Sequence, residues 1–338
     1  MKQTRVLFVS YRRCVPVGQM GALKRCLRLM AAMTDKYEIF SLNFGPFFEG
    51  DPLQLSLASR VTFLAETPAS ELDRLFRTIA PDAVVLGECP LAGSMRKAYQ
   101  AAIRCGIPQF AIDNYYGRCI ARIIQTAFWK IRRWLMLGLA PQPDSAKWSW
   151  GREVVPPLLP ALGETASGAR DGIVVIGYDR ATLEMALEIL RAIGQGQKVD
   201  MFCSGPSRQL LAGLDFTALG HELRYHWEPE ETELYQAIAR SRLVLGKAGF
   251  QQIVESLSLG TPVVFRMVPG GLRPFMLPRA MRPYVQPVRD LRALPHAMPR
   301  IRDWVSHSRI VKLGNASVPG QDPVRFAASR LESMIEAG

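Results

Sequence analysis

The 338 residues exceed the roughly 250 to 300 at which a single hydrophobic core stops growing, so the length predicts two domains. With 48% hydrophobic and 21% charged residues, the chain is close to the globular averages, which excludes the disordered, collagen-like and coiled-coil classes. Its 42 Lys and Arg against 30 Asp and Glu give a formal charge of +12, which favours an anionic partner such as a phosphate-bearing substrate, a nucleic acid or an acidic membrane.

The first half of the chain predicts a repeat of strand and helix. Short apolar runs alternate there with helical patterns, the arrangement that builds parallel sheets with crossover helices. The predicted elements are strands at 6–10, 39–43, 82–87 and 109–112 and helices at 21–33, 70–79 and 93–105.

A proline-rich stretch at 141–160, which also carries Trp148 and Trp150, follows this half. Because proline disrupts helices and central strands, we expect the interdomain linker there. The alternation then restarts, and the chain ends in an amphipathic helix at 323–337. The predicted elements of the second half are strands at 173–176, 199–203, 223–225, 243–245 and 262–265 and helices at 183–192, 231–239 and 251–259. Both halves are therefore expected to be doubly wound α/β domains.

A strand, a glycine-containing turn and a helix follow one another within residues 237–265. A helix that begins at Gly249 or Phe250 directs its unpaired N–H groups and the positive end of its dipole at the carboxyl edge of the strands, where a pyrophosphate would bind. Glu255 lies about one and a half turns into that helix, where its carboxylate can accept hydrogen bonds from ribose hydroxyls. Any α/β turn needs a small residue and can carry an exposed Glu, so the spacing leaves a purely structural interpretation equally open.

This segment resembles the donor-binding signature of GT-B glycosyltransferases, particularly glycosyltransferase family 28, whose members include the lipid-intermediate N-acetylglucosaminyltransferase of peptidoglycan synthesis. The matching positions are Ala248, Gly249, Gln252, Glu255, Gly260 and Pro262. The resemblance implies that Gly249 and Phe250 offer N–H groups to the diphosphate of a nucleotide-sugar, with UDP-sugars as the first candidates. It also implies that Gln252 supports the diphosphate and that Glu255 binds the ribose. Trp227 is expected near the nucleobase, with a core position as its alternative.

By the same resemblance the fold is of GT-B type, with two Rossmann-like domains that face a cleft. The first, at 1–160, would bind the acceptor, and the second, at 161–320, would bind the nucleotide-sugar. A helix at 321–338 would pack back on the first domain.

Residues 17–27 resemble the Gly-x-Gly-His-x-x-Arg-Cys-Leu segment of the pseudaminic acid pathway's nucleotide-sugar hydrolase and its relatives. The resemblance implies that Gly18 and Gly21 let an acceptor or the donor phosphate approach backbone amides. Where those relatives have a histidine, this chain has Ala22, which cannot act as a general base or bind a phosphate.

Two carboxylates are the candidate catalytic bases. Glu88 and Asp113 each follow a predicted strand, and α/β folds bind ligands at the carboxyl ends of their strands. The alternatives are that Glu88 caps the next helix and that Asp113 starts a turn with Asn114. Arg12 is a candidate contact for an acidic acceptor, and Arg273 for a diphosphate or an anionic acceptor, with an exposed solvated loop as its alternative. The four histidines show no metal-ligand spacing, so no metal site is expected.

Taken as a helix, residues 119–135 place apolar side chains such as Phe128, Trp134 and Leu135 on one face and Arg122, Arg132 and Arg133 on the other. Such a helix can lie in the headgroup region of an anionic membrane, or it can pack on a sheet. A nucleic-acid partner is not expected, because the basic residues are dispersed and no recognised nucleic-acid-binding signature occurs.

Six cysteines without a CxxC pair predict reduced thiols and a cytoplasmic protein. The apolar run before Tyr11 spans about five residues, shorter than a signal peptide core. No uncharged apolar stretch approaches the roughly 18 residues of a membrane span.

We therefore expect a metal-independent glycosyltransferase, of hexosyltransferase type, that needs no cofactor beyond its nucleotide-sugar substrate. Two alternatives remain open: a nucleotide-sugar hydrolase, which would release free sugar without an acceptor, and a catalytically silent GT-B protein, which would bind a ligand or partner without turnover. The donor sugar, the acceptor and the oligomeric state cannot be predicted from the sequence.

Overall fold

The computed structural model describes residues 3–11, 21–45, 52–65, 67–68, 70–90, 93–114, 126–137, 152–159, 170–177, 179–203, 207–211, 213–227, 229–247, 249–268, 277–307, 311 and 322–337. The chain divides into two compact units. The first unit contains Met1–Gly138, Gln142–Leu158 and Pro319–Gly338, and the second contains Leu139–Pro141 and Leu159–Val318. Each unit is built on one parallel sheet, so the predicted α/β class is confirmed.

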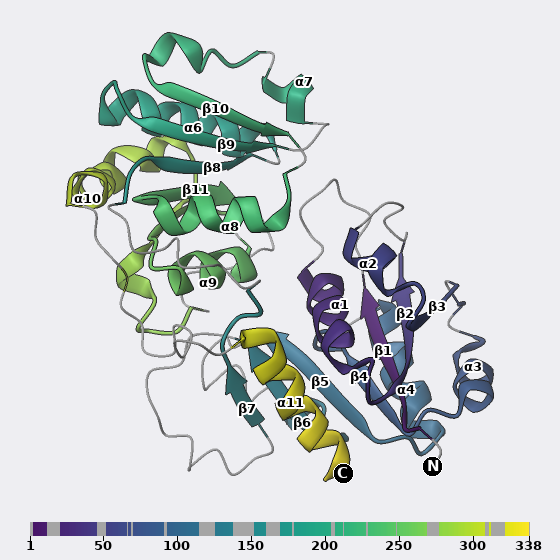
Figure 1. Ribbon diagram of the computed structural model, residues 1–338. Helices are drawn as coiled ribbons and strands as arrows, with labels where there is room; N and C mark the ends of the chain where they lie inside the picture. Colours follow the sequence, from purple (N-terminus) through teal and green to yellow (C-terminus); the bar gives the residue numbers. More distant parts are fainter. Residues whose placement is uncertain are drawn as a thin grey trace. The chain divides into compact units, whose positions relative to one another are not determined.

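The sheet of the first unit has seven strands in the order β3-β2-β1-β4-β5-β6-β7 (Figure 1). Its strands are β1 (Arg5–Tyr11), β2 (Glu38–Phe44), β3 (Val61–Leu64), β4 (Ala83–Leu86), β5 (Gln109–Asn114), β6 (Ile131–Leu137) and β7 (Arg152–Val155). The central strand β1 is buried on both faces, which is why it reads as a continuous apolar run. Val6 and Phe8 point to one core cluster, and Leu7 and Val9 to the other.

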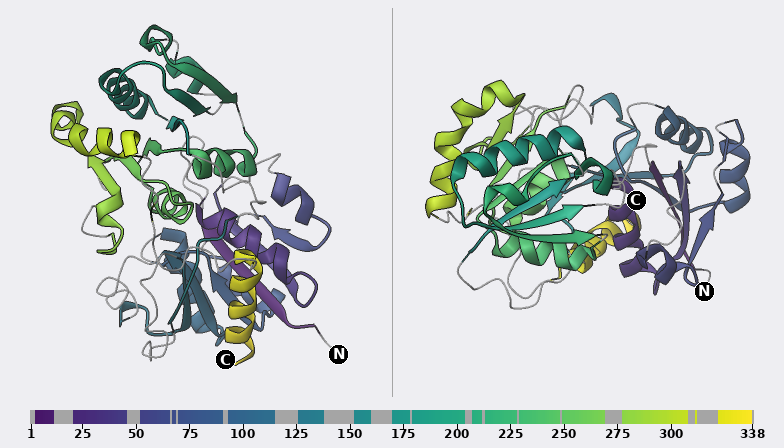
Figure 2. Two further views of the ribbon diagram at one scale, coloured as in Figure 1. Left: turned by 60° about the vertical axis from the view of Figure 1, so that its left-hand side comes forward. Right: turned by 90° about the horizontal axis from the view of Figure 1, so that it is seen from above.

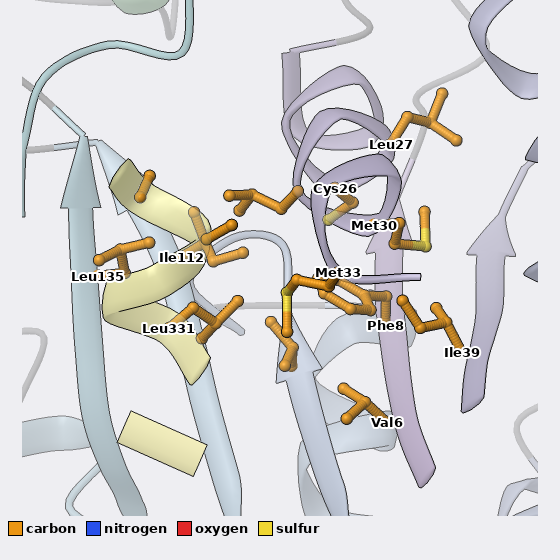
Figure 3. Close-up of a cluster of buried hydrophobic side chains, with 14 of the residues drawn as sticks. Val6, Phe8, Cys26, Leu27, Met30, Met33, Ile39, Ile112, Leu135 and Leu331 are labelled. Carbon is orange, nitrogen blue, oxygen red and sulfur yellow. The ribbon is translucent and has the colours of Figure 1, made fainter. Parts of the chain in front are cut away.

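Helices cover both faces of this sheet. They are α1 (Gly21–Met33), α2 (Pro52–Leu57), α3 (Leu72–Ile79), α4 (Gly93–Arg104) and α11 (Pro323–Glu336). Side chains of α1 and α11 share a cluster with Phe8 of β1, whereas those of α3 and α4 contribute to the cluster on the opposite face. Figure 3 shows Leu331 of α11 beside Ile112 and Leu135 in the first of these clusters.

The C-terminal helix α11 is an integral part of the first unit, although about 160 residues of the second unit precede it in the chain. Asp322 caps its amino end by accepting a hydrogen bond from the N–H of Val324 at 2.8 Å. Leu331 and Met334 are fully buried, and Lys36 forms an ion pair with Glu336 at 2.5 Å. The views in Figure 2 show α11 beside α1.

The second unit has a six-stranded parallel sheet in the order β10-β9-β8-β11-β12-β13. Its strands are β8 (Ile173–Gly177), β9 (Lys198–Cys203), β10 (Glu222–Trp227), β11 (Leu243–Lys247), β12 (Val263–Arg266) and β13 (Val285–Val288). Its helices are α6 (Arg180–Ile193), α7 (Ser207–Leu211), α8 (Glu231–Arg240), α9 (Phe250–Ser258) and α10 (Leu294–His307), with short 3-10 helices at Thr217–Leu219, Arg282–Tyr284 and Leu291–Ala293. The main core cluster of this unit joins α6 and α10 to one face of the sheet, and α8 and α9 lie on the other face (Figure 1).

The helix predicted at 119–135 is wrong for its last residues, because β6 begins at Ile131 and pairs with β5 and β7. Side chains along β6 alternate between the two cores: Trp134 lies in one cluster and Leu135 in the other. The apolar face that would have entered a membrane is therefore buried in the sheet at these positions. Residues 119–125 lie outside the described ranges, and in those ranges no helix has the length and apolarity that a bilayer span requires.

Within the predicted linker at 141–160, residues 152–155 form β7 at the edge of the first sheet. Proline is compatible with this arrangement, since Pro156 and Pro157 follow the strand and an edge strand needs partners on one side alone.

Candidate functional site

The predicted strand, turn and helix of the second unit are present at the carboxyl edge of its sheet. Strand β11 ends at Lys247, and α9 begins at Phe250. Gly249 is the N-cap of α9, with φ −122° and ψ 124°, and Phe250 is buried and anchors the first turn. The positive end of the α9 dipole therefore lies at the strand ends, as a phosphate site requires. The N–H of Gly249 donates a hydrogen bond to the carbonyl oxygen of Lys247 at 2.8 Å, so the predicted contact of this N–H with a diphosphate requires that bond to be exchanged.

Gln252 packs its side-chain amide against the end of β11. A Cβ atom on Gly246 would lie 2.2 Å from Nε2 of Gln252, so any larger residue at position 246 would clash with the Gln252 side chain where it now lies. Nε2 is buried and has no hydrogen-bond partner among the described residues. A buried donor without a partner is costly, so a ligand oxygen at this point would be stabilised.

Glu255 lies one turn further along α9 and is only 7% exposed. Its Oε1 accepts a hydrogen bond from Nε2 of Gln251 at 2.8 Å. The predicted contact of Glu255 with a ribose stays a prediction, and it requires a ligand that reaches the carboxylate beside Gln251.

Three charged residues at the same edge, Asp179, Lys247 and Arg266, were not predicted from the sequence. Asp179 caps α6 by accepting a hydrogen bond from the N–H of Thr182 at 2.9 Å. It forms ion pairs with Arg266, at 3.0 Å, and with Lys247, at 3.7 Å. Two sequence signals were available. Asp179 follows β8 and stands three residues before Thr182, a spacing typical of a helix N-cap, and β11 and β12 each end in a basic residue.

Trp227 is the last residue of β10 and is partly buried. Its ring stacks on that of Tyr225, with centroids 5.9 Å apart, and the guanidinium of Arg208 lies 4.5 Å above it. The proximity of Trp227 to a nucleobase stays a prediction.

The neighbouring His226 is held between two carboxylates. Its Nε2 lies 2.9 Å from Asp200 and its Nδ1 2.5 Å from Glu233, and its ring stacks on that of Phe202. Partial burial lowers the pKa of His226, but the hydrogen bonds to both carboxylates outweigh this effect and raise it above the ordinary value. Within the described part of the chain, no three His, Cys, Asp or Glu side chains are grouped as metal ligands.

In the first unit, the candidate bases lie where β4 and β5 end. Asp113 is a residue of β5, so it does not start a turn with Asn114, and Glu88 lies five positions before the first residue of α4. Burial raises the pKa of Asp113, while the charge of Arg25 and the N–H groups of Asn114 and Cys89 oppose this effect. A carboxyl group with a raised pKa is suited to proton transfer.

Arg25 of α1 was not singled out as a functional residue, yet it connects these strand ends. It is only 3% exposed and donates hydrogen bonds to Oδ1 of Asn114 at 2.6 Å and to the carbonyl oxygen of Gly87 at 3.0 Å. Burial raises the pKa of Cys26 to about 12, and burial, Asp113 and Glu88 raise the pKa of Cys89. Both thiols therefore stay protonated at neutral pH, and Asp113 and Glu88 remain the candidate bases.

Four predicted contacts cannot be placed fully. Arg12, Gly18 and Arg273 lie outside the described residues, and Gly21 is the first residue of α1.

The chain has the GT-B fold. Each of its two units is a parallel sheet with helices on both faces, and in the second unit the amino end of a helix lies at the carboxyl edge of the sheet. Solved structures match the chain over almost its whole length. The crystal structure of MurG from Acinetobacter baumannii has a TM-score of 0.63 at 12% identity and covers 99% of this chain and 100% of its own. A UDP-glucosyltransferase from Polygonum tinctorium has a TM-score of 0.60 at 12% identity, covering 100% and 99%. The spinosyn rhamnosyltransferase SpnG complexed with thymidine diphosphate has a TM-score of 0.53 at 14% identity, covering 99% and 96%.

No protein-family model matches the chain. A search of curated proteins also found no match. At identities of 12 to 14% the structural similarity shows the fold, and the chemistry has to be argued from the site.

Proposed function

We propose that the chain is a glycosyltransferase that moves a sugar from a nucleoside-diphosphate donor, a UDP-sugar being the first candidate, to an acceptor. The observation that carries the proposal is the buried Nε2 donor of Gln252, which has no partner among the described residues and lies in the first turn of α9. The similar structures include a UDP-glucosyltransferase and a rhamnosyltransferase complexed with thymidine diphosphate, and these support a nucleotide-sugar site of this kind.

In this proposal the second unit binds the donor. The amide of Gln252 and the positive end of the α9 dipole hold the diphosphate beside Gly249 and Phe250, Glu255 binds the ribose and Trp227 lies near the base. The same donors stabilise the negative charge that develops on the departing nucleoside diphosphate, which is the main electrostatic requirement of the reaction. We propose that these groups perform this task without a metal ion.

The first unit would bind the acceptor, and Asp113 or Glu88 would take the proton from its hydroxyl group. Asp113 is the better candidate, because its burial raises its pKa. Arg25 would position this edge through Asn114 and Gly87. Gly18, Gly21, Arg12 and Arg273 remain proposed contacts for the acceptor or a phosphate.

A catalytically silent GT-B protein is the second candidate, and Ala22 is the observation that favours it. A nucleotide-sugar hydrolase differs from a transferase in using water as the acceptor. We further propose a cytoplasmic location, with peripheral membrane contact as a partner interaction.

Product analysis distinguishes these functions. The protein is incubated with UDP-sugars and dTDP-sugars, with and without simple sugar and lipid-phosphate acceptors, and nucleotide and sugar products are separated by chromatography. The proposal predicts nucleoside diphosphate release that increases with one acceptor. Equal amounts of free sugar and nucleoside diphosphate without an acceptor would identify a hydrolase, and binding without any product would identify the silent protein.

A further inference from the structure

Two basic residues lie side by side at the carboxyl edge of the second sheet. Lys247 ends β11 and Arg266 ends β12, and the two residues are direct partners in the parallel register of these strands. Leu245 and Val264, two positions earlier on each strand, point into the core cluster that contains α6. Because side chains two residues apart share a face, Lys247 and Arg266 both lie on the α6 side of the sheet.

Both cations are directed at the amino end of α6, where Asp179 is the N-cap. Oδ1 of Asp179 accepts hydrogen bonds from the N–H and the hydroxyl of Thr182, at 2.9 and 3.0 Å, and from Arg266 at 3.0 Å. Oδ2 is buried and accepts no hydrogen bond from a described residue. Nζ of Lys247 is 3.7 Å from Oδ2, beyond hydrogen-bond distance.

This arrangement concentrates positive charge. Cations are favourable at the carboxyl end of a helix and unfavourable at its amino end, yet Lys247 and Arg266 approach the amino end of α6. Asp179 offsets one of the two positive charges, so a surplus remains. The three side chains are 21 to 28% exposed, so salt screens them less than it would at the open surface. Within the described residues, Nζ of Lys247 donates no hydrogen bond and is held by its 3.7 Å ion pair with Asp179, so the ammonium group can still donate hydrogen bonds to an anion.

The position of this charge points to the kind of anion. Gly249, the N-cap of α9, is two residues beyond Lys247, so the backbone of Lys247 is close in the chain to the amino end of α9, while the side chains of both cations lie at the amino end of α6. A phosphoryl group offers several oxygens to such a combination of guanidinium, ammonium and N–H donors.

We propose that Lys247 and Arg266 form a phosphoryl-binding subsite, and that Asp179 holds their side chains in place until the phosphoryl group binds. The inference rests on the proposed function, because the phosphoryl group would be part of the donor's diphosphate. The carboxylate of Asp179 competes with the phosphoryl group for the same two cations. It therefore lowers the affinity of the subsite for anions.

Calorimetric titration with inorganic pyrophosphate, UDP, dTDP and uridine tests the subsite. Lys247→Gln and Arg266→Gln are expected to weaken binding of pyrophosphate and of the nucleoside diphosphate about tenfold or more, because each removes a charge-assisted contact. Uridine, which carries no phosphate, should show no such change. Arg266→Lys keeps the charge and should restore part of the affinity.

The matched control is Lys198→Gln. Lys198 is a strand residue of the same sheet and forms an ion pair with Asp171 at 2.5 Å, but it lies at the amino end of β9. Its substitution should leave pyrophosphate binding unchanged. Thermal unfolding of each variant checks that the fold is retained.

Asp179→Asn gives the sharpest result, because asparagine keeps the capping oxygen and removes the competing charge. The proposal predicts tighter pyrophosphate binding in this variant, opposite in sign to the effect of Lys247→Gln. A purely structural role of Asp179 predicts weaker or unchanged binding, and that result would overturn the proposal.

The outcomes separate this inference from the proposed function. If the wild-type protein binds a nucleoside diphosphate and both charge-removing variants bind it equally well, the subsite is wrong and the donor site stands. If pyrophosphate binds with the predicted variant pattern but no nucleoside diphosphate binds, the subsite stands for free phosphate compounds and the donor site is wrong. If the wild-type protein binds no pyrophosphate and no nucleotide, both are wrong.

Discussion

At the residue scale, the site depends on side chains that several distant segments bring together. The strand-turn-helix segment that contains Gly249, Gln252 and Glu255 could be predicted, because its spacing is visible in the sequence, whereas the contacts of these residues with a ligand stay predictions. The contact of Lys247 and Arg266 with Asp179 could not be predicted, because it depends on the sheet order β8-β11-β12, which places non-consecutive strands side by side. Local patterns carry no information on such an order.

Gly246→Ala tests the packing of Gln252. The new methyl group would lie 2.2 Å from Nε2 of Gln252, so the amide must move away from the end of β11. We expect a loss of about 1 kcal/mol in the free energy of unfolding, measured by urea denaturation. The cost should shrink when Gln252→Ala is already present, because the clash is then absent.

Gly249→Ala is the matched control. Its Cβ would lie 3.9 Å from Gln252, an ordinary contact, and the backbone of Gly249 has a negative φ. Equal destabilisation by Gly246→Ala and Gly249→Ala would contradict the packing described.

The buried carboxyl group of Asp113 predicts a pH dependence of stability. Its pKa in the folded protein is raised by burial, so the folded state binds its proton more tightly than the unfolded state. This contribution to stability is fully present below the ordinary pKa of aspartate, about 3.9, and is lost as the pH rises through the raised value. Asp113→Asn removes it. The free energy of unfolding of the wild type, relative to this variant, should therefore fall as the pH rises from about 4 to neutrality, and a constant difference in urea denaturation would contradict the prediction.

At the element scale, the strands and helices that the sequence predicts best are those with one unambiguous period. Helix α1 has the predicted bounds, and buried strands such as β1 and β8 appear as continuous apolar runs. The sequence predicts a helix over β6 because Ile131, Trp134 and Leu135 also fit a helical spacing. The pairing with β5 and β7 that makes this segment a strand is a tertiary contact, which the local pattern does not show.

Other elements carried contrary local signals. Strand β13 contains Pro287, which its position at the sheet edge tolerates, and α10 contains Pro299. Proline indicates neither a strand nor a helix interior in a local sequence pattern, so the sequence did not predict β13 and α10.

The docking of α11 gives a prediction at this scale. Leu331 is fully buried in the cluster that joins α11 to α1 and the sheet. Leu331→Ala should lower the free energy of unfolding by about 2 to 5 kcal/mol in urea denaturation. Arg325→Ala, on the same helix but with a side chain that is 86% exposed, should change it by less than about 0.5 kcal/mol. Similar effects of the two substitutions would mean that α11 is not packed on the first unit.

At the scale of the whole molecule, each unit has its own sheet and core, and the functional candidates lie at the carboxyl edge of each sheet. This location follows from the fold, because helices begin where parallel strands end, and the amino ends of these helices direct their N–H groups to that edge. The surplus of basic residues, +12 in all, suits an anionic ligand. The length and the α/β alternation were sufficient to predict this organisation, whereas the identity of the sugar and of the acceptor depends on contacts that no sequence pattern encodes.

The central claim is that the second unit binds a nucleoside diphosphate at the amino end of α9. Calorimetric titration of the purified protein with UDP, dTDP and GDP, repeated on Glu255→Ala, tests it most directly. We predict saturable binding of one of the three, weakened at least about tenfold in Glu255→Ala because a ribose hydroxyl loses a charged acceptor. Absence of binding by all three nucleotides, or equal binding by the variant and the wild type, would contradict the assignment of this site.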